Sequence, residues 1–197
     1  MKKGDFVRAR VKSSTNGSVI EDLERLIPVG FGFVHKAIDE SLIKHGVGDS
    51  YSLDLSVKEA YGSRQRSLIK MINARFFRES QLNPVKGLMV NVDGLLGKVV
   101  SVSPGRVLVD FNHPLAGKPV KFEVKVLGLV TDDVVRVKAL LKLMLGQDFV
   151  VERVGKELIV KDFNFPEEVR VKVGVELNKV LGKTVARSIK YLSVEGN

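Results

Sequence analysis

The chain has 197 residues, a formal net charge of +9, and a composition that is 44% hydrophobic and 28% charged. These values are typical of a folded protein that is long enough for more than one compact module. The sequence contains no cysteine, which excludes disulfides, thiolate zinc sites and cysteine nucleophiles. No apolar run approaches the roughly 20 residues of a membrane span, so we expect a soluble, cytoplasmic protein.

The first third of the chain predicts strands around one helix. Residues 5–12 alternate apolar and charged side chains, which predicts a half-buried strand, and Asn16-Gly17 marks a hairpin turn after it. Residues 34–43 place apolar side chains at helical spacing and are followed by glycines, which predicts a helix. Residues 50–57 alternate again and predict a second strand.

The middle of the chain predicts a small all-β region. Residues 61–87 are loop-rich, with a short helix near residues 73–77. Three short strands are then predicted at residues 88–93, 96–102 and 106–111, because Asp93-Gly94 and Pro104-Gly105 between them are turn signals. Residues 119–130 predict a further strand that closes this region.

The pattern changes at Thr131. A helix is predicted from there to Gly146, with acidic residues in its first turn, and a hairpin is predicted across residues 154–156. A second helix is predicted after Pro166, and a last strand at residues 184–195. We therefore expect residues 131–197 to form a separate αββαβ module.

Conventional catalytic motifs are absent from the sequence. His35, His45 and His113 do not stand at metal-ligand spacing, and there is neither a P-loop nor a nucleophile elbow. The segment "GFGFVHKA" lacks the third glycine of a dinucleotide fingerprint, and the carboxylates are scattered. The sequence indicates no metal and no cofactor.

Residues 71–96 are unusually apolar for so small a region. Flexible Met and Phe side chains suit the binding of varied hydrophobic segments, but they also build cores, and we expect the set to be divided between the two roles. The candidate client-binding residues are Met71, Ile72, Phe76, Phe77, Leu82, Met89, Leu95 and Leu96.

Four segments resemble the FKBP family of peptidyl-prolyl cis-trans isomerases, in its prokaryotic and archaeal long, SlyD-like form. They are "NGSVIED", "VGFGFVHKAIDESLIKHGVGDSYSLDL", "KEAYG" and, most distinctively, "VLVDFNHPLAGKPVKFEVKV". The resemblance implies an α+β fold in which an FKBP-like antiparallel sheet, residues 1–65 and 118–130, wraps on a short helix. It also implies an inserted flap domain with a chaperone role at residues 66–117, and a C-terminal α+β extension at residues 131–197.

The resemblance further implies an isomerase groove and its residues. Ile20 and Glu21 match an apolar-acid pair, Val34 and His35 a substrate-facing pair, Ile38 the groove floor, Tyr61 a hydroxyl donor and Phe122 an aromatic wall. The implied partners are unfolded, proline-containing polypeptides, and no cofactor is needed. Asp110, Asn112 and His113 could suggest a catalytic or metal cluster, but by resemblance they form the structural junction where the chain re-enters the sheet.

Several positions depart from the family pattern. Arg10 stands where a Tyr is usual, Glu21 where an Asp is usual, His35 where an Ile or Val is usual, and Ala37 where a Gly is common; Ile38 replaces an aromatic residue. A charged Arg10 and a polar His35 in the groove would wet it, which predicts weakened isomerisation.

Two alternatives follow from the same sequence. The net charge of +9 and the segment "GLLGKVVSVSPGRVLVDF", which resembles small β-barrels of ribosomal and transcription proteins, favour an RNA- or ribosome-binding protein whose binding falls steeply with salt. The departures at Arg10 and His35 favour a degenerate isomerase that acts only as a holdase.

Overall fold

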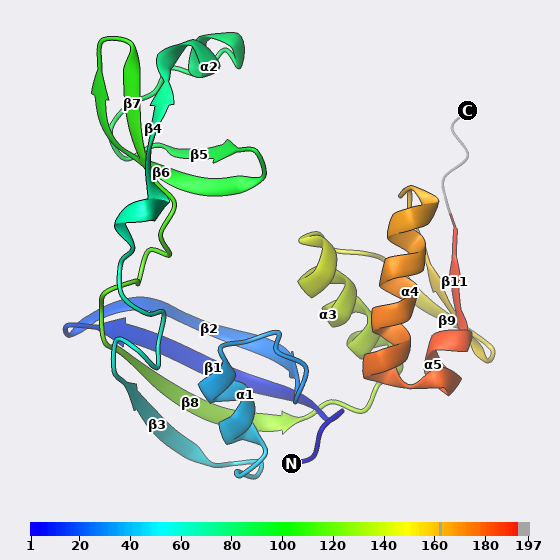
Figure 1. The fold of residues 1–197 in the computed structure, drawn as a ribbon. Helices are drawn as coiled ribbons and strands as arrows, with labels where there is room; N and C mark the ends of the chain where they lie inside the picture. Colours follow the sequence, from blue (N-terminus) through cyan, green and yellow to red (C-terminus); the bar gives the residue numbers. More distant parts are fainter. Residues whose placement is uncertain (162, 193–197) are drawn as a thin grey trace. The chain divides into compact units, whose positions relative to one another are not determined.

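The structure is a computed structural model and describes residues 1–161 and 163–192 (Figure 1). Its contacts divide the chain into two compact units: one joins residues 1–53 to the residues from 121 onward, and the other is Asp54–Val120. The fold is mixed α+β, with several antiparallel sheets and a few helices, as the sequence predicts. No helix in the described ranges is long and apolar enough to cross a membrane.

A four-stranded antiparallel sheet forms the first part of the first unit. Its strands are β1 (Phe6–Thr15), β2 (Ser18–Pro28), β3 (Ser50–Leu55) and β8 (Val120–Leu129), in the order β2-β1-β8-β3. β1 and β2 meet at the predicted hairpin turn, where Asn16 and Gly17 both have positive φ. This is the backbone geometry that Asn-Gly favours in a two-residue hairpin.

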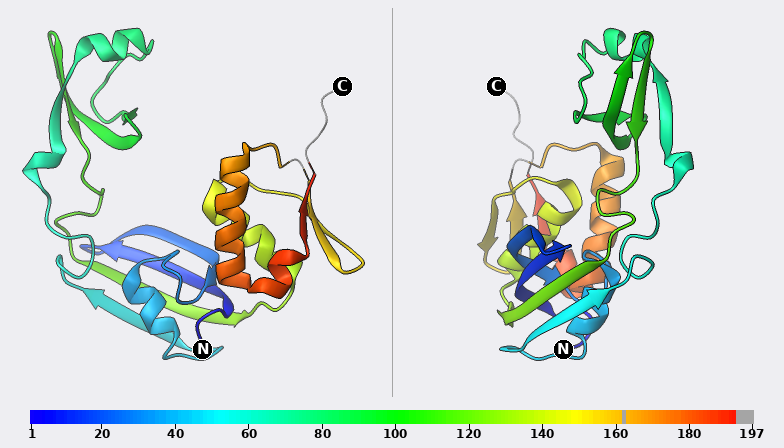
Figure 2. Two further views of the ribbon diagram at one scale, coloured as in Figure 1. Left: turned by 45° about the vertical axis from the view of Figure 1, so that its right-hand side comes forward. Right: turned by 90° about the vertical axis from the view of Figure 1, so that its left-hand side faces the viewer.

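Alternation along β1 assigns its side chains to two faces. Val7, Ala9 and Val11 are buried on one face, while Arg8 and Arg10 are exposed on the other. Helix α1 (Lys36–Leu42) lies on the apolar face (Figures 1 and 2) and buries Ile38 and Leu42. We call this the α1 face of the sheet.

The loop that leads into α1 is anchored by one buried carboxylate. Asp39 accepts hydrogen bonds from the backbone N–H groups of Gly30, at 2.7 Å, and Gly32, at 2.9 Å. Both glycines have positive φ, which explains why glycine recurs in this loop. The two glycines therefore shape the loop that Asp39 anchors.

The second unit is a small sheet covered by one short helix. Its elements are η1 (Arg66–Leu68), β4 (Ile69–Asn73), α2 (Ala74–Glu79), β5 (Met89–Val92), β6 (Leu95–Ser103) and β7 (Arg106–Asp110), with strand order β4-β7-β6-β5. Phe77 of α2 is fully buried against valines of the sheet. The expectation of a loop at residues 69–73 was wrong, because β4 forms there by pairing with the distant strand β7.

The C-terminal residues add two longer helices and a three-stranded sheet to the first unit. The elements are α3 (Asp133–Leu145), β9 (Val151–Val154), β10 (Glu157–Val160), α4 (Glu167–Leu181), α5 (Lys183–Arg187) and β11 (Ile189–Tyr191). The strand predicted at residues 184–195 was wrong in its first half, because α5 forms there and only residues 189–191 pair, parallel to β10. Residues 193–195 of that prediction lie outside the described ranges.

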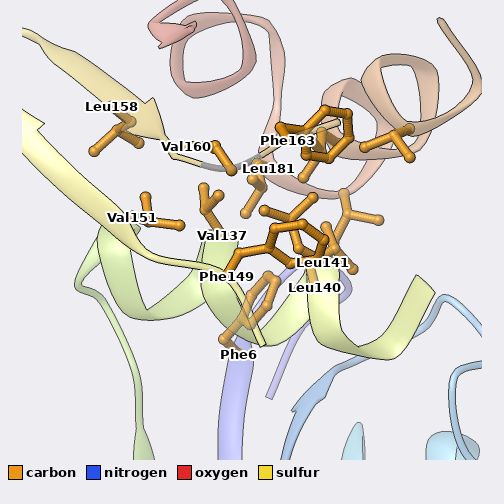
Figure 3. Packing of buried hydrophobic residues seen from close by; sticks show 13 residues of the cluster. Phe6, Val137, Leu140, Leu141, Phe149, Val151, Leu158, Val160, Phe163 and Leu181 are labelled. Atoms are coloured by element: carbon orange, nitrogen blue, oxygen red, sulfur yellow. The ribbon is translucent and has the colours of Figure 1, made fainter. Parts of the chain in front are cut away.

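Phe6, at the start of β1, joins the sheet to the C-terminal helices. Its ring is buried with Val137, Leu140 and Leu141 of α3 and with Phe149 (Figure 3). The Arg136 guanidinium lies 4.8 Å from the centre of the same ring, a cation–π contact. The first unit therefore has a core to which both β1 and α3 contribute.

Candidate active site on the sheet and its inserted unit

The register of the first sheet places three of its residues in one row. Ser13 of β1 pairs with Glu21 of β2 on one side and with Phe122 of β8 on the other. Residues in register share a face, and adjacent strands lie about 4.8 Å apart. Ser13 and Phe122 are buried, so the row runs from the core to a partly exposed carboxylate at the sheet edge.

His35, at the start of α1, packs against Phe122 at one end of this row. It is the N-cap of α1, and its Nδ1 atom accepts a hydrogen bond of 3.2 Å from the backbone N–H of Ala37. Its ring centre lies 5.4 Å from that of Phe122, with 36° between the planes. The imidazole that replaces the expected aliphatic residue therefore has a capping role and also packs on the aromatic wall.

Sequence reasoning missed Leu23. In β2 it lies two residues after Glu21, pairs with Val11 and therefore faces the same side. Its side chain is 50% exposed, which is high for a leucine beside a core. Because residues i and i+2 of a strand lie on one face, the position of Glu21 is the signal that could have identified Leu23.

The interpretation of Arg10 was wrong. Arg10 points away from the α1 face and forms two hydrogen bonds with the Asp22 carboxylate, at 2.7 and 2.9 Å. These hydrogen bonds hold the pKa of Asp22 below its ordinary value and raise that of Arg10. The pair lines a charged hollow of about 610 Å³ on the opposite face, so Arg10 does not wet the α1 face.

The other predicted groove residues lie in different surroundings. Ile38 is buried under α1, whereas Ile20 is half exposed at the bulge of the β1–β2 ladder. Val34 lines a separate hollow beside Gly30, Gly32 and Asp39. The structure therefore places Glu21 and Phe122 in one row of the sheet with His35 against Phe122, whereas Val34 lines another hollow.

Tyr61 belongs to the second unit, where His113 holds its ring. The two rings are stacked, with centres 3.8 Å apart and 6° between the planes. His113 Nδ1 also accepts a hydrogen bond of 3.2 Å from the backbone N–H of Leu115. In the described part of the chain no three acidic or histidine side chains gather to hold a metal ion.

The segment around Asn112 has the structural role that the sequence predicts. Asn112 Oδ1 accepts from the backbone N–H of Gln65, at 2.8 Å, and its Nδ2 donates to the Gln65 carbonyl, at 3.0 Å. Asp110 accepts from the Asn112 backbone N–H and Nδ2 and pairs with Arg64. Burial raises the Asp110 pKa, but these hydrogen bonds and the Arg64 charge outweigh burial and leave it below its ordinary value.

The apolar residues predicted for client binding are divided between core and surface. Phe77 is fully buried, so its assignment as a contact residue was wrong, and Ile72 and Phe76 pack partly buried against the same core. The exposed members are Met71, Leu82, Met89, Leu95 and Leu96. Phe77 serves the core because α2 has only one face against the sheet.

A pocket of about 700 Å³ lies beside two of the exposed residues. Met89 and Leu96 line it together with Phe111 and Pro114. Phe111 and Pro114 were not among the predicted residues, although both stand in the segment that carries the family resemblance. The pocket combines flexible, aliphatic and aromatic groups, a mixture suited to varied apolar ligands.

Comparisons with known proteins agree with this architecture. Residues 70–115 match the family model described as "FKBP26, IF domain". A short-type peptidyl-prolyl cis-trans isomerase of Methanocaldococcus jannaschii is 29% identical over 144 residues, which cover 64% of this chain and 92% of that protein.

Two Escherichia coli proteins are also similar. The FKBP-type 16 kDa peptidyl-prolyl cis-trans isomerase is 28% identical over 106 residues, covering 52% of this chain and 71% of its own length. The FKBP-type peptidyl-prolyl cis-trans isomerase SlyD is 26% identical over 113 residues, which cover 51% of this chain and 53% of SlyD.

The names of these relatives support a peptidyl-prolyl isomerase, and the mixed α+β fold is consistent with an FKBP-like one. The chain is similar to FKBP-type peptidyl-prolyl cis-trans isomerases, SlyD among them, and its residues 70–115 match the FKBP26 IF domain.

Proposed function

We propose that the α1 face catalyses rotation about X-Pro bonds in unfolded polypeptides, while the second unit holds those clients. The observation that carries the first part is the row Glu21–Ser13–Phe122, closed by His35. Leu23 supplies exposed apolar surface next to this row.

The chemistry needs no nucleophile. Planar amide resonance sets the high barrier of an X-Pro bond, and the twisted transition state loses that resonance together with part of the carbonyl polarity. An apolar surface that excludes water holds the twisted form better than the planar forms and so lowers the barrier. On this face Leu23 is half exposed, and the buried ring of Phe122 packs against His35 in the neighbouring row.

A matched pair of variants tests the position of the catalytic surface. Leu23→Ser removes an exposed apolar group from the α1 face, and Arg10→Gln removes an exposed group from the opposite face. In a protease-coupled assay with a short X-Pro peptide, we expect Leu23→Ser to lower kcat/KM by roughly three- to tenfold, about the factor gained by burying the exposed half of one leucine side chain. Arg10→Gln should leave it unchanged, and equal losses in the two variants would contradict the proposal.

The client-holding part is supported by the exposed apolar side chains of the second unit. Leu96 is 67% exposed and Met71 is 60% exposed, although leucine and methionine side chains are usually buried. In an assay of reduced insulin aggregation, the full chain should suppress aggregation and Leu96→Ser should suppress it less. Ser101→Ala, at another exposed position of β6, is the control and should behave like the unchanged chain.

A further inference from the structure

Two lysines line the pocket beside Met89 and Leu96, and neither has a carboxylate partner in the described part of the chain. Lys98 and Lys118 both line this pocket and are exposed. Within residues 1–161 and 163–192, neither forms an ion pair or a hydrogen bond through its ammonium group. The pocket therefore presents apolar surface and two available positive charges together.

The carboxylate among the pocket-lining residues is already engaged. Asp110 stands directly across from Lys98 in the β6–β7 register, but its oxygens bind Arg64 and Asn112. Three donors thus surround that carboxylate, and Lys98 has no anionic partner among the residues that the structure describes.

The net charge of the second unit is positive, like the charges of Lys98 and Lys118 in its pocket. Residues 54–120 contain ten Lys and Arg against five Asp and Glu, so this third of the chain carries more than half of the net +9. A field of this sign raises the local concentration of anionic ligands. It also disfavours clients that bring further positive charge into the pocket.

We propose that this pocket selects client segments in which an Asp or Glu side chain stands beside apolar residues. The inference deepens the proposed client-holding function and rests on it. The apolar residues of such a segment contact Met89, Leu96 and Phe111, and its carboxylate pairs with the ammonium groups of Lys98 and Lys118. The aliphatic stems of these lysines add to the apolar wall, as lysine stems commonly do.

Three labelled peptides test the selection on the full chain. Each lacks proline, is acetylated and amidated, and has the same Leu-Phe-Leu centre flanked by two Glu, two Gln or two Lys residues. By fluorescence anisotropy we expect the Glu peptide to bind roughly three- to tenfold more tightly than the Gln peptide, with the Lys peptide weakest. The preference should shrink as salt is added.

Charge-reversal variants test whether the acidic peptide binds in this pocket. Lys98→Glu with Lys118→Glu should invert the order of the Glu and Lys peptides. Lys86→Glu with Arg106→Glu changes the net charge of the unit equally at exposed positions outside the pocket and should keep the order. Inversion by this second pair as well would overturn the pocket assignment.

The remaining outcomes separate the inference from the function on which it rests. Equal binding of the Glu and Gln peptides would overturn the charge selection and leave client holding intact. Binding of none of the three peptides would overturn both. Binding of single-stranded RNA that depends on Lys98 and Lys118, without binding of the Glu peptide, would assign the lysines to a nucleic acid instead.

Discussion

The ring of Tyr61 stacks on the ring of His113, with their centres 3.8 Å apart and their planes 6° from parallel. These residues are separated by the whole small sheet in sequence, since one precedes it and the other follows it. The stack therefore joins the two connections of the second unit close to the pairing of Asn112 with Gln65.

Loss of this stack should weaken the second unit. His113→Ala removes one ring, and we expect it to lower the free energy of unfolding by about 0.5–1.5 kcal/mol beyond the area lost, as for other aromatic pairs. His113→Phe keeps a ring there and should retain most of the stability. Urea unfolding followed by tyrosine fluorescence measures both, and equal stability of the Ala and Phe variants would contradict a role for stacking.

Asp110 should make the stability of the second unit depend on acid pH. Its folded pKa is lowered, so its contribution is complete above the unfolded value of about 3.9 and is lost as the pH falls through the folded pKa. We expect Asp110→Asn to cost about 1–3 kcal/mol at pH 7.

At pH 3 the difference between Asp110→Asn and the unchanged chain should be smaller, because protonation has then begun to remove the same charge. Urea unfolding at the two pH values measures this. A cost that is the same at both, or larger at pH 3, would show that the charge of Asp110 does not support the fold.

Gly97 should tolerate no side chain. A Cβ atom placed there would lie 2.5 Å from Val109 Cγ1 and 2.8 Å from the Phe111 ring, so both would have to shift. We expect Gly97→Ala to lower the free energy of unfolding by about 1–3 kcal/mol. Gly128→Ala is the matched control, because it lies in a strand with open space around it, and a loss as large there would contradict the packing argument.

Phe6 should stabilise the packing of the C-terminal helices. Phe6→Ala leaves a cavity against Val137 and Leu140, and we expect a loss of about 3–5 kcal/mol in thermal or urea unfolding. Val150→Ala, at a half-exposed position in the same C-terminal region, should cost less than about 0.5 kcal/mol. Similar small losses for both variants would mean that Phe6 does not join the core.

Much of the fold could be predicted from local sequence patterns. The wrong predictions concern features that depend on contacts between residues distant in sequence. The alternation of residues 5–12 and the turn at Asn16-Gly17 predict β1 and its hairpin, because both signals are local. Strand β4 was missed because its stabilising partner, β7, is distant in sequence. Phe77 and Met71 could not be separated because tertiary packing decides their burial: Phe77 of α2 packs on the sheet, whereas Met71 of β4 is exposed.

Arg10 shows why the candidate site could be predicted only in part. A β-strand exposes alternate residues to opposite faces, so an error of one residue in register reverses the assignment of every side chain. The ladder between β1 and β2 shifts register between Ser13 and Ser14, an irregularity that residue patterns do not reveal. Phe122 and His35 were predicted as candidates by resemblance, whereas Leu23 became a candidate only from the strand register.

The most direct test of the proposed catalytic surface is nuclear magnetic resonance of the full chain during titration with a short X-Pro peptide. Exchange spectroscopy should show accelerated cis–trans interconversion of the peptide, and amide shifts should concentrate at Glu21, Leu23, His35 and Phe122. Accelerated exchange with shifts concentrated at Arg10, Asp22 and Glu123, which line the charged hollow on the opposite face, would contradict this assignment, as would a peptide that binds without accelerated exchange.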